Sequence, residues 1–332
     1  MAEPKVAPPV DTAGGGDDAA HGNTFRRWLN VLTRIVGSRA FRWGFVAVAV
    51  ALAAYALASD WTAIRRALAQ LGPWSLVGAL ISIFLVYVVT VQMWRLLLAA
   101  LGSALPYPVA ARVLLIGAIG KYVPGSIWPV LASMELGRDH QVPRSRSASA
   151  SILQMLLALI SALLIACVTL PFAGGSLPYW WALLGVPPLL ILLWPRVLNA
   201  IISRLLRIAR QPPLEAQLTG STLVRAMAWS VVCWLFYGLQ IWILAIRLGA
   251  PPGQTALIAV GAFAFAWSIG FLVVFAPAGA GIRDVLLLVL LGSVLRTSEA
   301  AAVVLASRVL TTVADMASAA AAARSVRRHR AQ

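Results

Sequence analysis

A long apolar run without charge is the feature that most constrains the fold. No aspartate, glutamate, lysine or arginine occurs between Ser147 and Pro195. The run is long enough for two bilayer crossings, because a membrane-spanning helix needs about 20 apolar residues. The rest of the chain agrees, since 61% of the 332 residues are hydrophobic, 11% are charged, and the mean hydropathy is +0.85. We therefore expect an all-α polytopic membrane protein.

The excess of basic residues fits this class. The formal net charge is +16, a value typical of nucleic-acid binding in a soluble chain. In a chain this apolar, arginines at the cytoplasmic ends of membrane helices explain the charge better. We therefore expect two binding partners, the membrane bilayer and an anionic membrane lipid as substrate, and no nucleic acid.

Metal and redox chemistry find little support in the sequence. Cys167 and Cys233 each lie within an apolar stretch, so they are interpreted as small packing residues. The 3 histidines are scattered through polar segments without the spacing of metal ligands. The Gly120-Lys121 pair is not a phosphate loop, because Tyr122 stands where Ser or Thr must bind magnesium. We predict no metal and no cofactor.

Apolar segments and their polar boundaries define three regions. We expect a disordered tail and an amphipathic interfacial helix in residues 1–42, an integral membrane domain in 43–323 and a basic cytoplasmic tail in 324–332. About six full crossings and two interrupted segments follow, or about eight crossings if the second interrupted segment crosses twice. The full crossings are expected near residues 43–59, 73–94, 147–170, 179–194, 222–246 and 299–323.

The two interrupted segments, residues 120–129 and 275–284, place proline, glycine and charge among apolar residues. Proline removes a backbone donor and glycine is a poor helix former, so both segments should break helices at membrane depth. Such backbone survives there only when it is buried in protein or lines a wet cavity. The alternative is that both are ordinary loops between spans. The predicted structural breaks are Pro124, Gly125, Pro129, Pro277, Gly279 and Gly281.

The distribution of positive charge predicts the orientation. With both termini in the cytoplasm, 20 of the 27 lysines and arginines fall on cytoplasmic segments. This count concerns the whole stretch around the first interruption, residues 108–134, which we call the first broken segment. It must leave and return on the cytoplasmic side as a re-entrant segment. The second, residues 254–296, begins and ends outside, as a re-entrant hairpin or as two crossings. Two re-entrant segments would open to opposite sides, as inverted repeats around a midplane site do.

Charged residues within the membrane domain are the candidate site. Each costs about 2.5 to 3.5 kcal/mol at a helix centre, so it should face the protein interior or a cavity. Arg283 follows two glycines at an expected helix start, where free backbone donors favour an anion. The residues concerned are Lys121, Glu135, Arg283, Asp284, Arg308 and Asp315.

Two interpretations of these charges remain open. In the structural one, Arg283 pairs with Asp284, Arg308 ties its helix to a neighbour with Asp315, and the remaining two reach water at the interface. In the functional one, the three cations converge on a phosphate and the two aspartates orient them. The substrate-binding residues would then be Lys121, Arg283, Asp284, Arg308 and Asp315.

At these residues the chain resembles the flippase-like membrane domain of the lysylphosphatidylglycerol synthase family, over about residues 43–323. The matching motifs are WR at 94–95, GKYVPG at 120–125, VPRS at 142–145, PAGAGIRD at 277–284 and SR at 307–308. Ala278 and Asp284 stand where family members usually have glycine and glutamate. Ser133 and Met134 stand where an arginine is common.

The resemblance implies a flippase that moves a phospholipid or a polyprenyl-phosphate-linked lipid between leaflets of a bacterial inner membrane. Two-part members carry an aminoacyl-transferase domain after the membrane part. Only nine residues follow Ala323, so we expect no such domain, no enzymatic activity and a separate lipid-modifying enzyme as a partner. The alternatives are a membrane-embedded glycosyltransferase or accessory subunit that acts on lipid-phosphate sugars, and a secondary transporter for a small anion.

Overall fold

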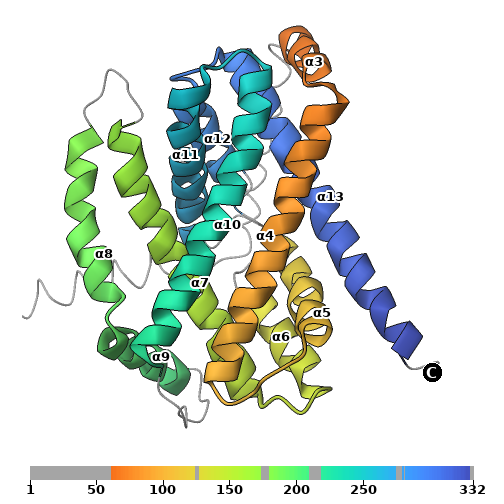
Figure 1. The fold of residues 1–332 in the computed structure, drawn as a ribbon, viewed down its shortest axis with the longest axis vertical. Helices are drawn as coiled ribbons and strands as arrows, with labels where there is room; N and C mark the ends of the chain where they lie inside the picture. Colours follow the sequence, from red (N-terminus) through yellow and green to blue (C-terminus); the bar gives the residue numbers. More distant parts are fainter. Residues whose placement is uncertain are drawn as a thin grey trace, which may run out of the picture. The chain divides into compact units, whose positions relative to one another are not determined.

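The computed structural model describes residues 61–123, 127–172, 179–208, 218–273, 279 and 281–329, and every regular element in these ranges is helical (Figure 1). The tail, the interfacial helix and the first crossing that the sequence predicts lie outside them. In chain order the elements are α3 (Trp61–Gln70), α4 (Gly72–Ala100), α5 (Tyr107–Ala118), the 3-10 helix η1 (Ile119–Tyr122), α6 (Trp128–Arg138), α7 (Arg144–Thr169), the 3-10 helices η2 (Leu170–Phe172) and η3 (Tyr179–Gly185), α8 (Val186–Leu192), α9 (Pro195–Ile208), α10 (Gly220–Arg247), α11 (Pro252–Leu272), α12 (Ile282–Leu291) and α13 (Thr297–His329).

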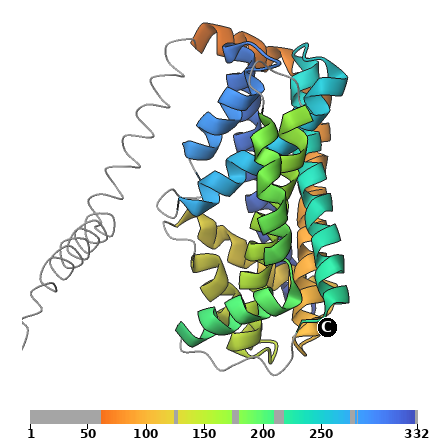
Figure 2. The ribbon, with the colours of Figure 1, turned by 90° about the vertical axis from the view of Figure 1, so that its left-hand side faces the viewer.

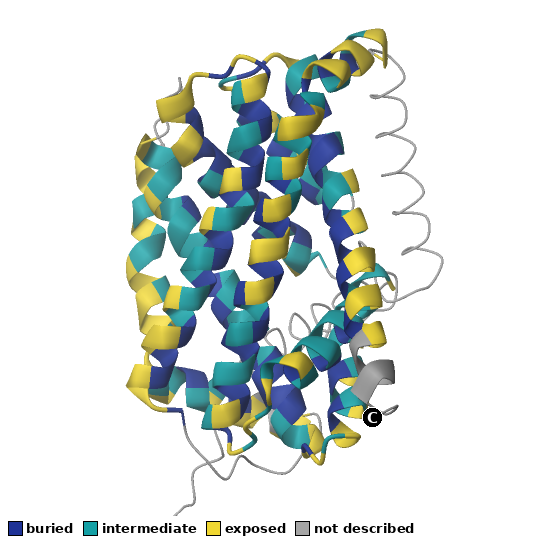
Figure 3. Ribbon diagram, turned by 45° about the vertical axis from the view of Figure 1, so that its right-hand side comes forward, coloured by how far each residue is buried: buried dark blue, intermediate teal, exposed yellow. Residues whose placement is uncertain are grey.

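Within the described ranges, five helices are long and apolar enough to cross a bilayer, namely α4, α7, α10, α11 and α13. The count rises to six if the bent pair of helical segments Trp180–Leu192 and Pro195–Arg204 is taken as one span. Buried residues lie on the inner faces of these helices and exposed ones on the outer faces (Figure 3). In a membrane protein the exposed apolar faces meet lipid. The fold is therefore an all-α polytopic membrane bundle, as the sequence predicts.

The crossing predicted at residues 179–194 differs from a single straight helix. It begins as the 3-10 helix η3, continues as α8 and turns by 74° into α9. Pro187 and Pro188 have no backbone N–H, so the chain cannot hydrogen-bond α8 back onto η3 in α-helical register. After the bend, α9 is an amphipathic helix that buries Leu198 and Ile202 and exposes Arg204.

The first broken segment, formed by α5, η1 and α6, starts and ends at the same end of the bundle. Arg146 Nη1 donates to the carbonyl oxygen of Gly102, shortly before α5 begins, at 2.8 Å. Arg144 Nη2 donates to Glu135 Oε1, near the end of α6, at 2.6 Å. Both arginines belong to the first turn of α7, so both ends of the segment lie beside that turn. This geometry agrees with the re-entrant prediction.

Close backbone packing holds the two halves of this segment together. Pro129, a predicted break, lies in the first turn of α6, where its missing N–H leaves no helical bond unmade. A methyl group on Gly120 would come within 2.9 Å of the carbonyl carbon of Trp128. The two halves therefore approach each other at a distance that only glycine permits. Pro124 and Gly125 lie outside the described residues.

The second broken segment, α11 and α12, starts and ends at the opposite end of the bundle. A groove lined by Leu248, Pro251, Gln254 and residues 292–296 places the start of α11 beside the end of α12. Gly72, at the start of α4, packs against the Arg247 side chain at the end of α10. The start of α4 therefore lies at the end of the bundle where the second segment enters. The first segment enters near Gly102, at the other end of α4, so the two segments enter from opposite ends of the bundle (Figure 1).

The predicted glycine breaks of the second segment have the conformation that requires glycine. Gly279 has φ +68° and Gly281 has φ +85°, in the region that L side chains rarely adopt. Gly281 immediately precedes α12 and is its N-cap residue. Pro277 lies outside the described residues. Gly279 lines the same interior cavity as Tyr87 and Asp315, which lie near the middle of α4 and α13, and this placement favours the re-entrant alternative over two full crossings.

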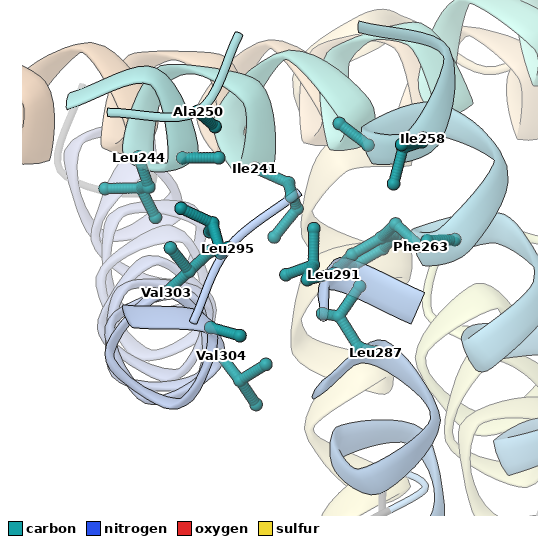
Figure 4. Packing of buried hydrophobic residues seen from close by; sticks show 14 of the residues in the cluster. Ile241, Leu244, Ala250, Ile258, Phe263, Leu287, Leu291, Leu295, Val303 and Val304 are labelled. Carbon is teal, nitrogen blue, oxygen red and sulfur yellow. The ribbon is translucent and has the colours of Figure 1, made fainter. Parts of the chain in front are cut away.

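The described chain has two halves with the same order of elements. A long helix, a broken segment and a second long helix run from α4 to α7 and again from α10 to α13, with the broken segments entering from opposite ends. This is the order expected for inverted repeats. The core of the second half packs Ile241, Phe263, Leu291 and Val303 from four different helices, all at most 1% exposed (Figure 4).

Candidate functional site

A cavity of about 300 Å³ lies where the two broken segments meet. Tyr87, Trp234 and Asp315 line it from near the middle of α4, α10 and α13, so it lies at mid-height in the bundle. Lys121 of η1 and Arg283 of α12 bring one cation from each broken segment. In Figure 2 the first broken segment, in olive, and the second, in light blue, approach each other at this height.

Most of the substrate-binding residues that the sequence predicts meet in this cavity. Lys121, Arg283, Arg308 and Asp315 line it, and Asp284 follows Arg283 at the start of α12. Glu135 lies elsewhere. Its side chain is 59% exposed at the end of α6, where it pairs with Arg138 at 3.5 Å and Arg144 at 2.6 Å.

Asp315 is the centre of a buried hydrogen-bond cluster. It is 5% exposed, and its carboxylate accepts hydrogen bonds from Tyr87 Oη at 2.6 Å, Tyr122 Oη at 2.6 Å and Lys121 Nζ at 2.7 Å. These donors come from α4 and η1, so one carboxylate joins α13 to both. Ionised partners make such bonds shorter and stronger than neutral ones. Asp315 thus anchors the end of the first half-helix of the broken segment.

Arg283 lies near the start of α12 and is 7% exposed. Its guanidinium carbon lies 5.5 Å from the centre of the Phe263 ring, and Nη2 lies 3.4 Å from Asp284 Oδ1. Its Nε is buried and has no hydrogen-bond partner among the described residues. Asp284 also accepts a hydrogen bond from the backbone N–H of Gly281 at 3.2 Å, which caps the helix. Arg283 therefore brings a largely buried cation to the cavity wall.

Arg308 lies two turns before Asp315 on α13 and also lines the cavity. It interacts electrostatically with Arg283, Asp284 and Asp315. Counting the lining residues together with the adjoining Asp284, the described site holds three cations and two carboxylates. A buried excess of positive charge is costly unless a further anion neutralises it. The site therefore suits an anionic ligand.

Aromatic side chains that the sequence analysis did not assign to a site form another part of the cavity wall. Trp234 and Trp267 lie with their ring centres 5.0 Å apart, and Trp267 stacks on Phe271 at 5.0 Å. Tyr237 stacks on Phe263 at 4.7 Å. Sequence alone gave no signal for these rings, because aromatic residues are common at lipid-facing and interfacial positions as well.

Uncharged polar side chains near the middle of the long helices complete the lining. Gln154 Nε2 donates to the carbonyl oxygen of Thr90 at 2.9 Å, and the hydroxyls of Ser230 and Ser161 lie 2.7 Å apart. Thr90, Gln154 and Ser230 line the cavity, as does Ser151. Their position at mid-span within apolar helices is the signal that could have identified them, because isolated polar groups are costly in hydrocarbon.

Groups for metal binding or thiol chemistry are few among the residues that the structure describes. They contain no group of three or more His, Cys, Asp or Glu side chains that could hold a metal ion. Cys167 and Cys233 are free thiols on α7 and α10, and Cys233 is buried. Thr90 Oγ1 lies 3.5 Å from Cys233 Sγ, a contact that fits the packing role predicted for this cysteine.

The fold and the site define a multi-pass membrane protein with a charged, partly aromatic cavity between two oppositely inserted broken segments. The chain belongs to the family described as the lysylphosphatidylglycerol synthase TM region, whose model matches residues 43–319. This match confirms the family resemblance that the motifs carry and includes almost all of the described bundle. Comparison with curated proteins found no match to the chain.

Proposed function

We propose that the protein is a lipid translocase that moves a phospholipid or a polyprenyl-phosphate-linked lipid between the leaflets of a bacterial inner membrane, with both termini in the cytoplasm. One observation carries the proposal. Lys121 on a segment that enters from one end and Arg283 on a segment that enters from the other line the same anion-suited cavity. Such a site can open toward each leaflet in turn while a polar headgroup stays away from hydrocarbon.

The Asp315 cluster gives the proposed movement a physical basis. It links the tip of the first broken segment to α13 through Lys121 and Tyr122. An arriving phosphate would compete with Asp315 for Lys121, because both are oxygen anions that accept from an ammonium group. Loosening of this link on headgroup binding would free the first broken segment to move relative to α13.

We further propose that the protein changes no covalent bond of its lipid. Both carboxylate oxygens of Asp315, which lines the cavity, accept hydrogen bonds, one from Lys121 and Tyr87 and the other from Tyr122. This arrangement supports a positioning role over a nucleophilic one. A separate lipid-modifying enzyme would then supply or consume the transported lipid.

Reconstitution into liposomes tests the proposal. Purified protein should accelerate the exchange of a fluorescent phospholipid between leaflets, measured as the fraction quenched by an impermeant reagent added outside. Arg283→Gln should lower that rate, whereas Arg296→Gln, at the exposed end of the bundle, should leave it unchanged. Release of a sugar or an aminoacyl product would support an enzyme instead. Uptake of inorganic phosphate without lipid exchange would support a small-anion transporter.

A further inference from the structure

The helix α9 has a row of arginines on one side, away from the cavity. Arg204 and Arg207 follow Arg196 by 8 and 11 residues, and at 3.6 residues per turn these spacings return to nearly the same side of the helix. All three are exposed, and the row is about 16 Å long by helical rise. No aspartate or glutamate occurs in the described residues 195–208 and 218–247, so neither α9 nor α10 supplies a counter-charge.

The opposite side of α9 is fixed to the bundle. Leu198 and Ile202 are fully buried and belong to the same apolar cluster as Leu223 of α10. Asn199 Nδ2 donates to the carbonyl oxygen of Leu218, and Asn199 Oδ1 accepts from the N–H of Leu218, both at 3.3 Å. The apolar side of α9 is therefore covered by protein, and the arginine row points away from the bundle.

Exposed tryptophans indicate the depth of α9 in the membrane. Trp194 is 61% exposed and lies at the 74° bend between α8 and α9. Trp180 and Trp181 are exposed at the other end of the apolar segment formed by η3 and α8. Tryptophan is enriched at both membrane–water interfaces, so the two ends of this segment fit the two interfaces. After the bend, α9 turns away from α8 at one end of the bundle, at the level of the lipid headgroups (Figure 1).

We infer that the arginine row of α9 binds the anionic lipid headgroups of the adjacent leaflet, at a surface separate from the cavity. Guanidinium groups donate paired hydrogen bonds to phosphate oxygens, and each arginine near an anionic membrane surface strengthens binding about fivefold. An acidic protein would match the charge as well, but the interfacial level marked by Trp194 favours lipid. None of the three arginines lines the cavity, so the inference goes beyond the proposed transport and does not depend on it.

A spin label in the middle of the row tests the contact with lipid. Ala200 is exposed and lies one helical turn from both Arg196 and Arg204. Ala200→Cys, in the full-length chain without Cys167 and Cys233, is labelled with a nitroxide and placed in nanodiscs of phosphatidylcholine with or without phosphatidylglycerol. Phosphatidylglycerol should lower the collision rate of the label with a neutral nickel complex in the water about twofold or more. High salt should reverse the effect, because it screens surface charge. An unchanged collision rate would overturn the inference.

Substitution of the arginines tests whether they carry the effect. Arg196→Gln combined with Arg204→Gln and Arg207→Gln should abolish the response to phosphatidylglycerol. Arg204→Gln alone should raise the fraction of phosphatidylglycerol needed for half of the response about fivefold. The side chains are exposed, so the melting temperature should hardly change. Arg65→Gln with Arg66→Gln is the matched control, because both side chains are exposed on α3, at the other end of the bundle (Figure 1). A full response in the triple variant, or its loss in the control, would overturn the inference.

Two further arms separate the membrane surface from other anions. Free glycerophosphoglycerol, added to the labelled protein in phosphatidylcholine nanodiscs, should leave the collision rate unchanged, because it does not concentrate at the interface. An effect equal to that of phosphatidylglycerol would overturn the assignment to lipid. Poly-glutamate stands in for an acidic protein. Protection of the label by poly-glutamate without protection by phosphatidylglycerol would assign the arginine row to a protein partner and overturn the inference.

Discussion

Lys121 and Asp315 are 194 residues apart in the chain, yet Lys121 Nζ lies 2.7 Å from both carboxylate oxygens. The pair joins the tip of the first broken segment to the middle of α13. Asp315 is almost fully buried, whereas a third of the Lys121 side chain is exposed, toward a cavity that Lys121 lines. The ion pair therefore joins a buried structural carboxylate, Asp315, to an ammonium group, Lys121, that a ligand in the cavity can reach.

Removal of the Asp315 charge should destabilise the protein more than removal of the whole pair. Asp315→Asn leaves Lys121 without its counter-ion and should reduce the free energy of unfolding by about 3 kcal/mol. Lys121→Met combined with Asp315→Asn should restore part of that loss. Denaturant unfolding of the purified variants in detergent measures both values. Glu135→Gln is the control, because the Glu135 side chain is 59% exposed in its ion pair with Arg144. It should reduce the free energy of unfolding by less than about 1 kcal/mol. A double variant no more stable than Asp315→Asn would contradict the prediction.

Replacement of Arg308 by lysine should impair transport while the fold is kept. Lysine retains the charge but loses the planar pair of donors that binds a phosphate. We expect the leaflet exchange rate to fall about tenfold, which corresponds to about 1.4 kcal/mol of lost transition-state stabilisation. The melting temperature should stay within a few degrees of the parent. An unchanged exchange rate would remove Arg308 from the proposed site.

The combination of Arg308→Ala and Asp315→Ala separates the two interpretations of these residues. If they only tie helices together, the double variant should be better tolerated than either single one. If Arg308 binds a headgroup, leaflet exchange should stay lost in the double variant. Exchange assays on all three variants, normalised to the amount of folded protein, decide between the two. Recovered exchange would leave Arg308 as a purely structural residue.

A methyl group at Gly120 should destabilise the first broken segment. It would meet the Trp128 carbonyl carbon at 2.9 Å and the Pro129 nitrogen at 3.0 Å, and backbone cannot rotate away as a side chain can. Gly120→Ala should reduce the free energy of unfolding by about 1 to 3 kcal/mol. Gly253→Ala is the matched control, because nothing lies within 4 Å of the added group there. Equal unfolding midpoints for the two variants would show that the half-helices can separate freely.

Accessibility of single cysteines tests the orientation. In a background without Cys167 and Cys233, cysteines at Ser145 and Ser203 should react only with reagent on the cytoplasmic side, and one at Ser293 only with reagent outside. The first two positions lie at the end of the bundle where the first broken segment enters, and Ser293 lies at the other end. Reaction of Ser145 from outside would contradict the re-entrant reading of α5 and α6.

Hydropathy and charge were enough to predict the main features of the fold. The crossings predicted at 73–94, 147–170 and 222–246 correspond to α4, α7 and α10, each a few residues longer in the structure. The residues added at their ends, which include Arg95, Arg144 and Arg247, belong to helices because backbone hydrogen bonds continue into the interface, where water is available. The bend between α8 and α9 was missed, because an apolar run with prolines shows that a helix breaks but does not give its new direction.

The site was predictable as a set of cations and carboxylates, but their pairing was not. Asp315 lies seven residues after Arg308 on one helix, so the sequence suggested a relation between those two. The hydrogen-bond partners of Asp315 at 2.6 to 2.7 Å are instead Lys121, Tyr122 and Tyr87, from two other elements. Contacts of such long sequence separation depend on how α13 packs on the first half. No local sequence pattern predicts that packing.

The close approach of Gly270 to Gly279 has a consequence for how the two cations can work. A methyl group on Gly270 would meet Arg283 Cβ at 3.1 Å and Gly279 Cα at 3.4 Å, so the backbone before α12 rests directly on α11. Arg283 therefore lies at a helix start that packs directly against α11, whereas the position of Lys121 depends on an ion pair for which an anionic ligand would compete. In the proposed cycle Arg283 would bind the headgroup at a fixed position, whereas Lys121 would move during transport. This asymmetry would give movement from each leaflet a different rate-limiting step.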